Sequence, residues 1–164
     1  MEKKRKSLPK IVKFKNEDAQ KLAELFNSFD RENLWPGGFT KGIPFTAERV
    51  LNTFPAGVRN ICILISTCDG MFTGVCSLHP HSEDSEAAYI GVFGVHPDYL
   101  GKGHGKALIL KAIEITAENG LKRADLNTWA GNMRAVPLYK NSRIFWVSET
   151  IVYMQDYFPG IISF

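Results

Sequence analysis

Apolar and polar residues recur along this chain with two different periods, which separate candidate strands from candidate helices. Short runs rich in β-branched and aromatic residues predict strands at 11–14, 60–67, 71–78, 87–95, 124–129, 144–147 and 151–157. Apolar residues on one helical side predict helices after an N-cap at Asn16 or Asp18, from Thr46 to Phe54, and at 106–119 and 134–140. The predicted order is βααβββαβαββ.

This order predicts a single mixed α/β domain, of the α+β type, with a central sheet of about seven strands flanked by helices. Asp69-Gly70 separates the second and third predicted strands, and an Asp-Gly pair between such runs favours a tight hairpin turn. The polar stretch 79–86 predicts an exposed connection to the next strand.

Composition and charge divide the chain into a body and two tails. Its 164 residues are 45% apolar and 23% charged, enough for one buried core. Residues 1–10 carry a charge of +4, more than the net +3 of the whole chain. We expect a flexible basic tail at 1–10, a domain at 11–157 and an apolar tail at 158–164. The nearly neutral body argues against a nucleic-acid surface.

Membrane, metal and disulfide signals are weak. No apolar run reaches the roughly 18 residues that span a bilayer, and no hydrophobic signal stretch follows the charged N-terminus, so we expect a soluble cytoplasmic protein. Cys62, Cys68 and Cys76 fit neither a disulfide framework nor a zinc motif and predict buried free thiols. His79 and His81 are two possible ligands without a third, so no metal is predicted.

The strongest chemical signal is Gly101-Lys102-Gly103-His104-Gly105-Lys106, between a predicted strand and a predicted helix. Alternate glycines let the backbone approach a ligand, and the free N–H groups at a helix start bind anions. The spacing does not fit a P-loop. A dinucleotide motif is a weaker alternative, because Lys106 stands where its third glycine belongs.

The wider stretch 95–108 resembles the cofactor motif of the GNAT superfamily of N-acetyltransferases. Leu126, Thr128, Asn132, Ala135 and Leu138-Tyr139 resemble the family's next strand and short helix in order and spacing. The resemblance implies a GNAT-type sheet and acetyl-CoA as acyl donor, with transfer to the amine of an acceptor and no metal.

The resemblance also implies roles for individual residues. Asn132 would hold the pantetheine arm, and Tyr139 would protonate the departing thiolate as general acid. The remaining cofactor contacts would be the strand edge at Phe93, Gly94 and Val95 and the pyrophosphate loop Gly101, Lys102, Gly103, His104, Gly105 and Lys106. Leu100 stands where the family usually has Arg or Gln, so Lys102 or Lys106 would supply the missing polar contact.

The sequence leaves the base and the acceptor open. The strand interior 89–94 lacks the carboxylate that many family members carry there; Glu86 is the favoured general base, with His79, His81 or a relayed water as alternatives. Trp35 and Phe39 either bind the acceptor or plug the edge of the core. Homodimerisation is open, and a non-catalytic acyl-CoA-binding module is the alternative function.

The end of the last short helix departs from the family as well. Arg143 stands where a glycine normally ends that helix. Asn141 is the expected substitute, because Asn tolerates the left-handed conformation better than most residues.

Overall fold

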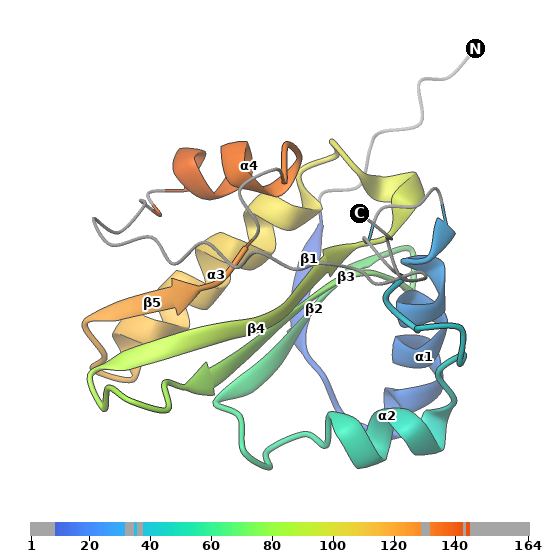
Figure 1. Cartoon of the computed structure of the whole chain (residues 1–164), viewed down its shortest axis with the longest axis horizontal. Helices are drawn as coiled ribbons and strands as arrows, with labels where there is room; N and C mark the ends of the chain where they lie inside the picture. Colours follow the sequence, from blue (N-terminus) through green and yellow to red (C-terminus); the bar gives the residue numbers. More distant parts are fainter. Residues whose placement is uncertain (1–8, 32–34, 36–37, 129–131, 143, 145–164) are drawn as a thin grey trace, which may run out of the picture.

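The computed structural model describes residues 9–31, 35, 38–128, 132–142 and 144. Five strands form one sheet in the order β1-β2-β3-β4-β5 (Figure 1). Their bounds are β1 Lys10–Lys13, β2 Cys62–Cys68, β3 Met71–Pro80, β4 Ala87–Val95 and β5 Arg123–Leu126. Neighbouring strands are antiparallel except β4 and β5, which run parallel. The mixed α/β class is confirmed, and the two strands expected after residue 143 fall outside the described residues, apart from Ile144.

Helices cover both faces of this sheet (Figure 1). The helical elements are η1 Asn16–Asp18, α1 Ala19–Ser28, α2 Ala47–Thr53, η3 Pro97–Tyr99, α3 His104–Glu118 and α4 Ala135–Asn141. Side chains of α1 and α2 share one buried cluster with Ile63 and Ile65, whereas α3 and α4 share a second with Cys62 and Leu64. Successive side chains of β2 point to opposite faces of the sheet and therefore contribute to two cores, one on each face.

Several local predictions are confirmed. Asp69 and Gly70 both have positive φ, 49° and 81°, as a type I′ hairpin turn requires. The Thr46 side chain accepts a hydrogen bond from the Arg49 N–H and caps α2. β4 has the predicted bounds.

Other local predictions are wrong in whole or in part. Asp18 is the N-cap residue of α1 but makes no side-chain hydrogen bond to the helix, whereas Asn16 lies in η1, and its side chain accepts from the Ala56 N–H. Asn141 lies within α4 and has no positive φ. Of the three free thiols, Cys68 is only partly buried. Within the described ranges, no helix is both long and apolar enough to cross a membrane.

Candidate functional site

In the described part of the chain, the backbone edge of β4 is open along its second half. β5 pairs with β4 only from Ala87↔Arg123 to Ile90↔Leu126, although β4 continues to Val95. Among the described strands, none pairs with residues 91–95 on that edge. An extended ligand can add to such an edge through main-chain hydrogen bonds. This is the segment where the sequence placed Phe93, Gly94 and Val95.

A bulge marks the point at which β4 becomes free. Cys76 pairs with Phe93 and Leu78 with Ile90, so Gly91 and Val92 both lie opposite Ser77. The Val92 N–H donates to Ser77 Oγ at 2.8 Å, which satisfies a backbone donor that the ladder leaves out. Such bulges bend a strand and redirect its side chains. The open segment therefore begins at a fixed irregularity of the sheet.

The glycine loop continues from β4 through η3 to the start of α3. Gly101 and Gly103 have positive φ, 69° and 90°, so both need a residue without a Cβ. α3 starts at His104, two residues before the predicted Lys106, and its first backbone bond runs from the Ala107 N–H to the Gly103 carbonyl. The N–H groups of residues 103–106 lack intrahelical acceptors, as in any helix start. Free N–H groups at a helix start can bind an anion, which is the role that the sequence predicts for this loop.

Gly105 is needed for packing rather than for its φ. A Cβ at this position would lie 3.0 Å from the side chain of Leu138 and 3.4 Å from those of Phe93 and Val95. α3 therefore approaches both α4 and the open segment of β4 closely. This contact joins the expected pyrophosphate loop to the expected pantetheine edge.

The His104 side chain points into the protein. Its Nδ1 lies 2.7 Å from Ser66 Oγ and 2.8 Å from Thr73 Oγ1, and its ring packs edge-on against Tyr99. Burial, followed by the nearby Lys102 charge, lowers the pKa of His104. Only the His104 main chain can face a ligand of the loop. Sequence reasoning missed Ser66 and Thr73, because they are far from His104 along the chain.

The two lysines of the loop differ in their surroundings. Lys102 donates to the Asp98 carbonyl at 2.5 Å and lies over the Tyr99 ring, 5.1 Å from its centroid. Lys106 is exposed in the first turn of α3. Lys106 is therefore the better placed of the two to contact a phosphate group at the helix start.

Tyr139 is buried beside the open segment of β4. Its ring lies 5.8 Å from that of Phe93, between centroids. Burial, with a smaller contribution from the Cys76 thiol, raises the pKa of Tyr139 to about 12. The phenol is therefore protonated across the neutral and mildly alkaline range and holds a proton that it can donate.

Asn132 is bound to the start of α4. Its Oδ1 accepts from the Ala135 N–H and its Nδ2 donates to Thr128 Oγ1, both at 3.1 Å. Because an amide nitrogen carries two hydrogens, one remains for a ligand. These bonds fix the side chain in the connection between β5 and α4.

Trp35 and Phe39 belong to an aromatic cluster on the α1 face. Trp35 stacks on Phe29 at 5.7 Å and Phe39 meets Phe29 edge-on at 5.2 Å. Phe29 in turn lies against β4, since a Cβ on Gly94 would be only 2.6 Å from its ring. The cluster therefore serves as core packing and also reaches the open segment of β4.

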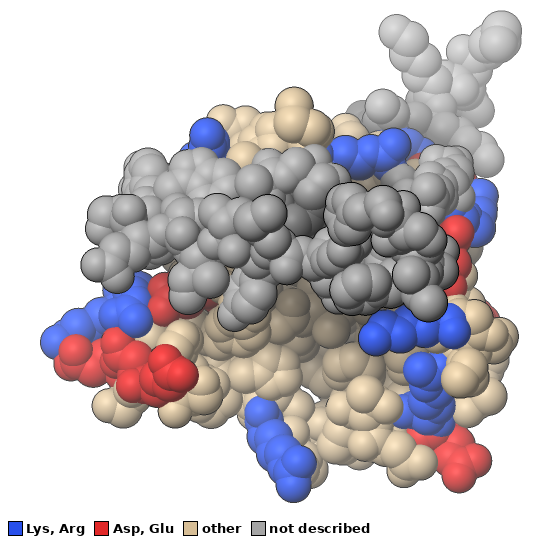
Figure 2. Space-filling model, viewed as in Figure 1, with Lys and Arg blue, Asp and Glu red and all other residues tan. Residues whose placement is uncertain are grey.

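Glu86 lies one residue before β4, at the opposite end of the strand from Val95. Its carboxylate pairs with Lys122 at 2.5 Å and is 57% exposed. Acidic and basic side chains gather at this end of β4 and β5, on the left in Figure 2. Nine residues of strand, about 30 Å at 3.3 Å per residue, separate Glu86 from Val95.

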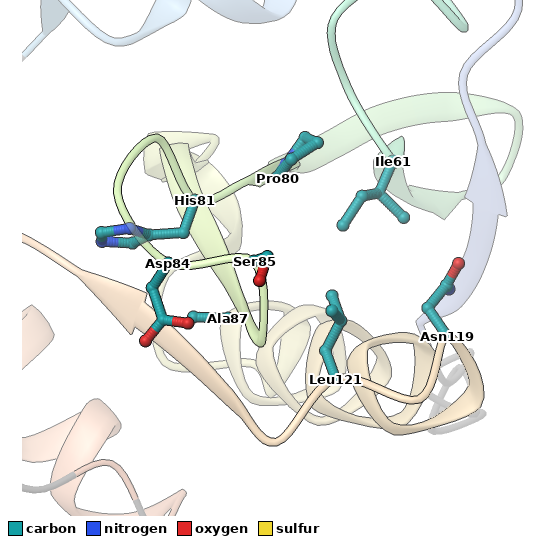
Figure 3. Close-up of a pocket in the computed structure, with 8 residues that line it drawn as sticks. All are labelled: Ile61, Pro80, His81, Asp84, Ser85, Ala87, Asn119 and Leu121. Carbon is teal, nitrogen blue, oxygen red and sulfur yellow. The ribbon is translucent and has the colours of Figure 1, made fainter.

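A small pocket of about 230 Å³ also lies at that opposite end. Its lining includes Ile61 and Leu121, with His81 and Asp84 to one side and Asn119 to the other (Figure 3). It is separate from the open edge and the glycine loop. In the described part of the chain, no three His, Cys, Asp or Glu side chains gather as metal ligands.

Comparisons with known proteins agree with this architecture. An aminoglycoside acetyltransferase from an uncultured soil metagenomic sample matches with a TM-score of 0.70 at 17% identity, over 91% of this chain and 95% of that chain. The PaiA N-acetyltransferase of Thermoplasma acidophilum, solved in complex with coenzyme A, matches with a TM-score of 0.64 at 22% identity, over 82% and 88%.

Sequence comparison is more specific. A mycothiol acetyltransferase of Clavibacter sepedonicus is 32% identical over 80 residues, which span 49% of this chain and 25% of that protein's length. The model of the acetyltransferase (GNAT) family matches residues 17–142, most of the chain. This chain therefore belongs to the GNAT family of acetyltransferases.

Proposed function

We propose that this protein transfers an acetyl or other short acyl group from acetyl-CoA to a primary amine by direct attack. The observation that carries the proposal is the open edge of β4 at residues 91–95, which lies between the glycine loop and Tyr139. Family membership supports acetyl-CoA as donor, as does the coenzyme A in the solved PaiA relative.

Different residues bind different parts of the acyl donor. The N–H groups at the start of α3 and the Lys106 side chain bind the pyrophosphate, and the β4 edge at Phe93 to Val95 pairs with the pantetheine arm. Asn132 holds the arm from the other side with its remaining amide hydrogen. This arrangement brings the thioester to Tyr139, beside Phe93.

Tyr139 acts on the leaving group. As the amine nitrogen bonds to the acyl carbon and the carbon–sulfur bond breaks, the Tyr139 phenol gives its proton to the thiolate. Its burial keeps the proton in place until sulfur develops negative charge. Trp35 and Phe39 line the part of the site that binds the acceptor, where their rings favour an amine with an apolar or aromatic body.

Substituting Tyr139→Phe tests the acid directly. The variant keeps the ring and loses the proton, so kcat should fall on the order of 10²- to 10⁴-fold, the usual contribution of a general acid. The KM for acetyl-CoA should stay unchanged, because the hydroxyl acts only as the thiolate forms. Release of free CoA in the presence of a panel of primary amines measures both.

Two results would count against this function. Full turnover by Tyr139→Phe would remove the acid role. Tight acetyl-CoA binding by calorimetry without turnover on any amine would favour a non-catalytic acyl-CoA-binding module instead.

A further inference from the structure

His79 lies beside the bulge of β4, on the α1 face of the sheet. A Cβ on Gly91 would be 3.1 Å from His79 Nε2 and equally far from Ser77 Oγ, so the imidazole covers this glycine. Gly91 is exposed and is the first residue of the open segment. The imidazole therefore borders the start of the proposed pantetheine edge.

Its hydrogen bonds fix the tautomer. His79 Nδ1 lies 3.0 Å from the Arg59 carbonyl oxygen, which can only accept, so Nδ1 carries the hydrogen. In the neutral ring, Nε2 then holds a lone pair. Ser77 Oγ lies 3.0 Å from Nε2 and donates to it while accepting from the Val92 N–H. An imidazole that a carbonyl holds with its Nε2 lone pair as the acceptor is arranged as a base once the Ser77 hydroxyl turns its hydrogen away.

We propose that His79 is the general base of the acyl transfer, an inference that rests on the proposed function. A primary amine enters as an ammonium ion, and His79 Nε2 takes one of its protons. The neutral nitrogen attacks the acyl carbon, the C–N bond forms, the C–S bond breaks and Tyr139 protonates the thiolate. The second ammonium proton, now on the amide nitrogen, returns to Tyr139. His79 releases its proton to solvent, so one proton leaves per turnover.

The network accommodates both protonation states. When Nε2 gains a proton, the Ser77 hydroxyl turns and accepts from Nε2 as well as from the Val92 N–H, since an oxygen has two lone pairs. Nδ1 keeps its bond to the Arg59 carbonyl. The Ser77 hydroxyl hydrogen gives up Nε2 as its acceptor, but the Val92 N–H keeps Ser77 Oγ, so the backbone bond at the bulge survives proton uptake.

The other candidate bases are bound elsewhere. The His81 Nδ1 lone pair accepts from the Glu83 N–H at 3.2 Å, and its Nε2 faces Asp125 at 3.7 Å. Glu86 is paired with Lys122 beyond the start of β4. His79 pairs across the strands with Tyr89, His81 stands two residues along the chain, and Arg59 meets the imidazole through its main-chain carbonyl.

Two variants of His79 separate a base from a structural residue. Glutamine can donate to the Arg59 carbonyl or accept from Ser77 but cannot take up a proton, whereas alanine leaves space for an added imidazole. With acetyl-CoA and 2-phenylethylamine as probes, His79→Gln should lower kcat about 10²-fold or more. His79→Ala should be equally slow and regain activity in proportion to added imidazole. Both should bind CoA like the wild type in calorimetry.

The outcomes separate this role from the proposed function. If His79→Gln turns over like the wild type, or imidazole fails to rescue His79→Ala while CoA binding is intact, His79 is not the base. If Glu86→Gln loses activity while His79→Gln keeps it, the base is Glu86. If the wild type releases no CoA with any amine, the proposed function itself fails.

Discussion

Replacing Gly94 by alanine tests how the aromatic cluster and the open segment of β4 fit together. The new Cβ would lie 2.6 Å and 2.8 Å from two carbons of the Phe29 ring, closer than real Cβ atoms come. Phe29 cannot turn away freely, because it is buried and packs against Phe26, Trp35 and Phe39. Overpacking of this kind costs about 1–3 kcal/mol.

Chemical denaturation measures the effect. Alanine gains about 0.5–1 kcal/mol over glycine in a strand, so from the middle of both ranges the net loss in the free energy of unfolding should be about 1 kcal/mol. With a urea m-value of about 2 kcal/mol per M, the midpoint should fall by about 0.5 M. Phe29→Leu removes the clashing ring edge, so the double variant should lose less than the two single losses combined.

Two results would refute this reasoning. An unchanged midpoint in Gly94→Ala would mean that the ring moves aside at no cost. Strictly additive losses in the double-mutant cycle would mean that Phe29 and Gly94 do not interact.

Two further predictions concern the loop and its surroundings. Gly103→Ala should cost about 1–2 kcal/mol of stability because of the left-handed φ of Gly103, and it should also weaken CoA binding in calorimetry. The control is Gly120→Ala, since Gly120 also has a left-handed φ but lies at the far end of α3. This variant should cost as much stability and leave CoA binding unchanged. The hydrogen bond from Arg31 is the main cause that lowers the pKa of Asp98 in the folded protein. This pair should therefore stabilise the fold at pH values above the unfolded pKa of Asp98, near 3.8, and the stabilisation should be lost as the pH falls through the lower folded pKa. In thermal unfolding, the Arg31→Met variant should lose slightly less stability than the wild type as the pH falls over that acidic range. Parallel plots of stability against pH for the two proteins would contradict the pairing.

Local signals in the sequence predicted local structure well. Asp69-Gly70 defines its turn through the backbone freedom of two adjacent residues, and Thr46 caps α2 through a contact three residues away. Gly101 and Gly103 are likewise explained by their own φ angles. In each case the determining interaction lies within one turn of chain, so reading the sequence was sufficient.

Interactions between residues far apart in the chain could not be predicted from the sequence in this way. Asn16 looked like a helix cap but binds Ala56, 40 residues away. His104 is a loop residue by sequence, yet Ser66 and Thr73 hold its ring inside the protein. The bulge that defines the open segment follows from the pairing of β3 with β4, and the sequence of β4 alone gives no sign of it.

The alternation of β3 explains how the proposed acid and the proposed base could serve one thioester without neutralising each other. Cys76 and Ser77 are consecutive and therefore point to opposite faces of the sheet. Cys76 lies in the α3-side cluster with Tyr139, whereas Ser77 binds His79 on the α1 side. Between them, no described strand pairs with residues 91–95 on the edge of β4, where we propose that the donor binds. In the proposed mechanism, the amine therefore loses its proton on the aromatic side and the sulfur gains one on the other.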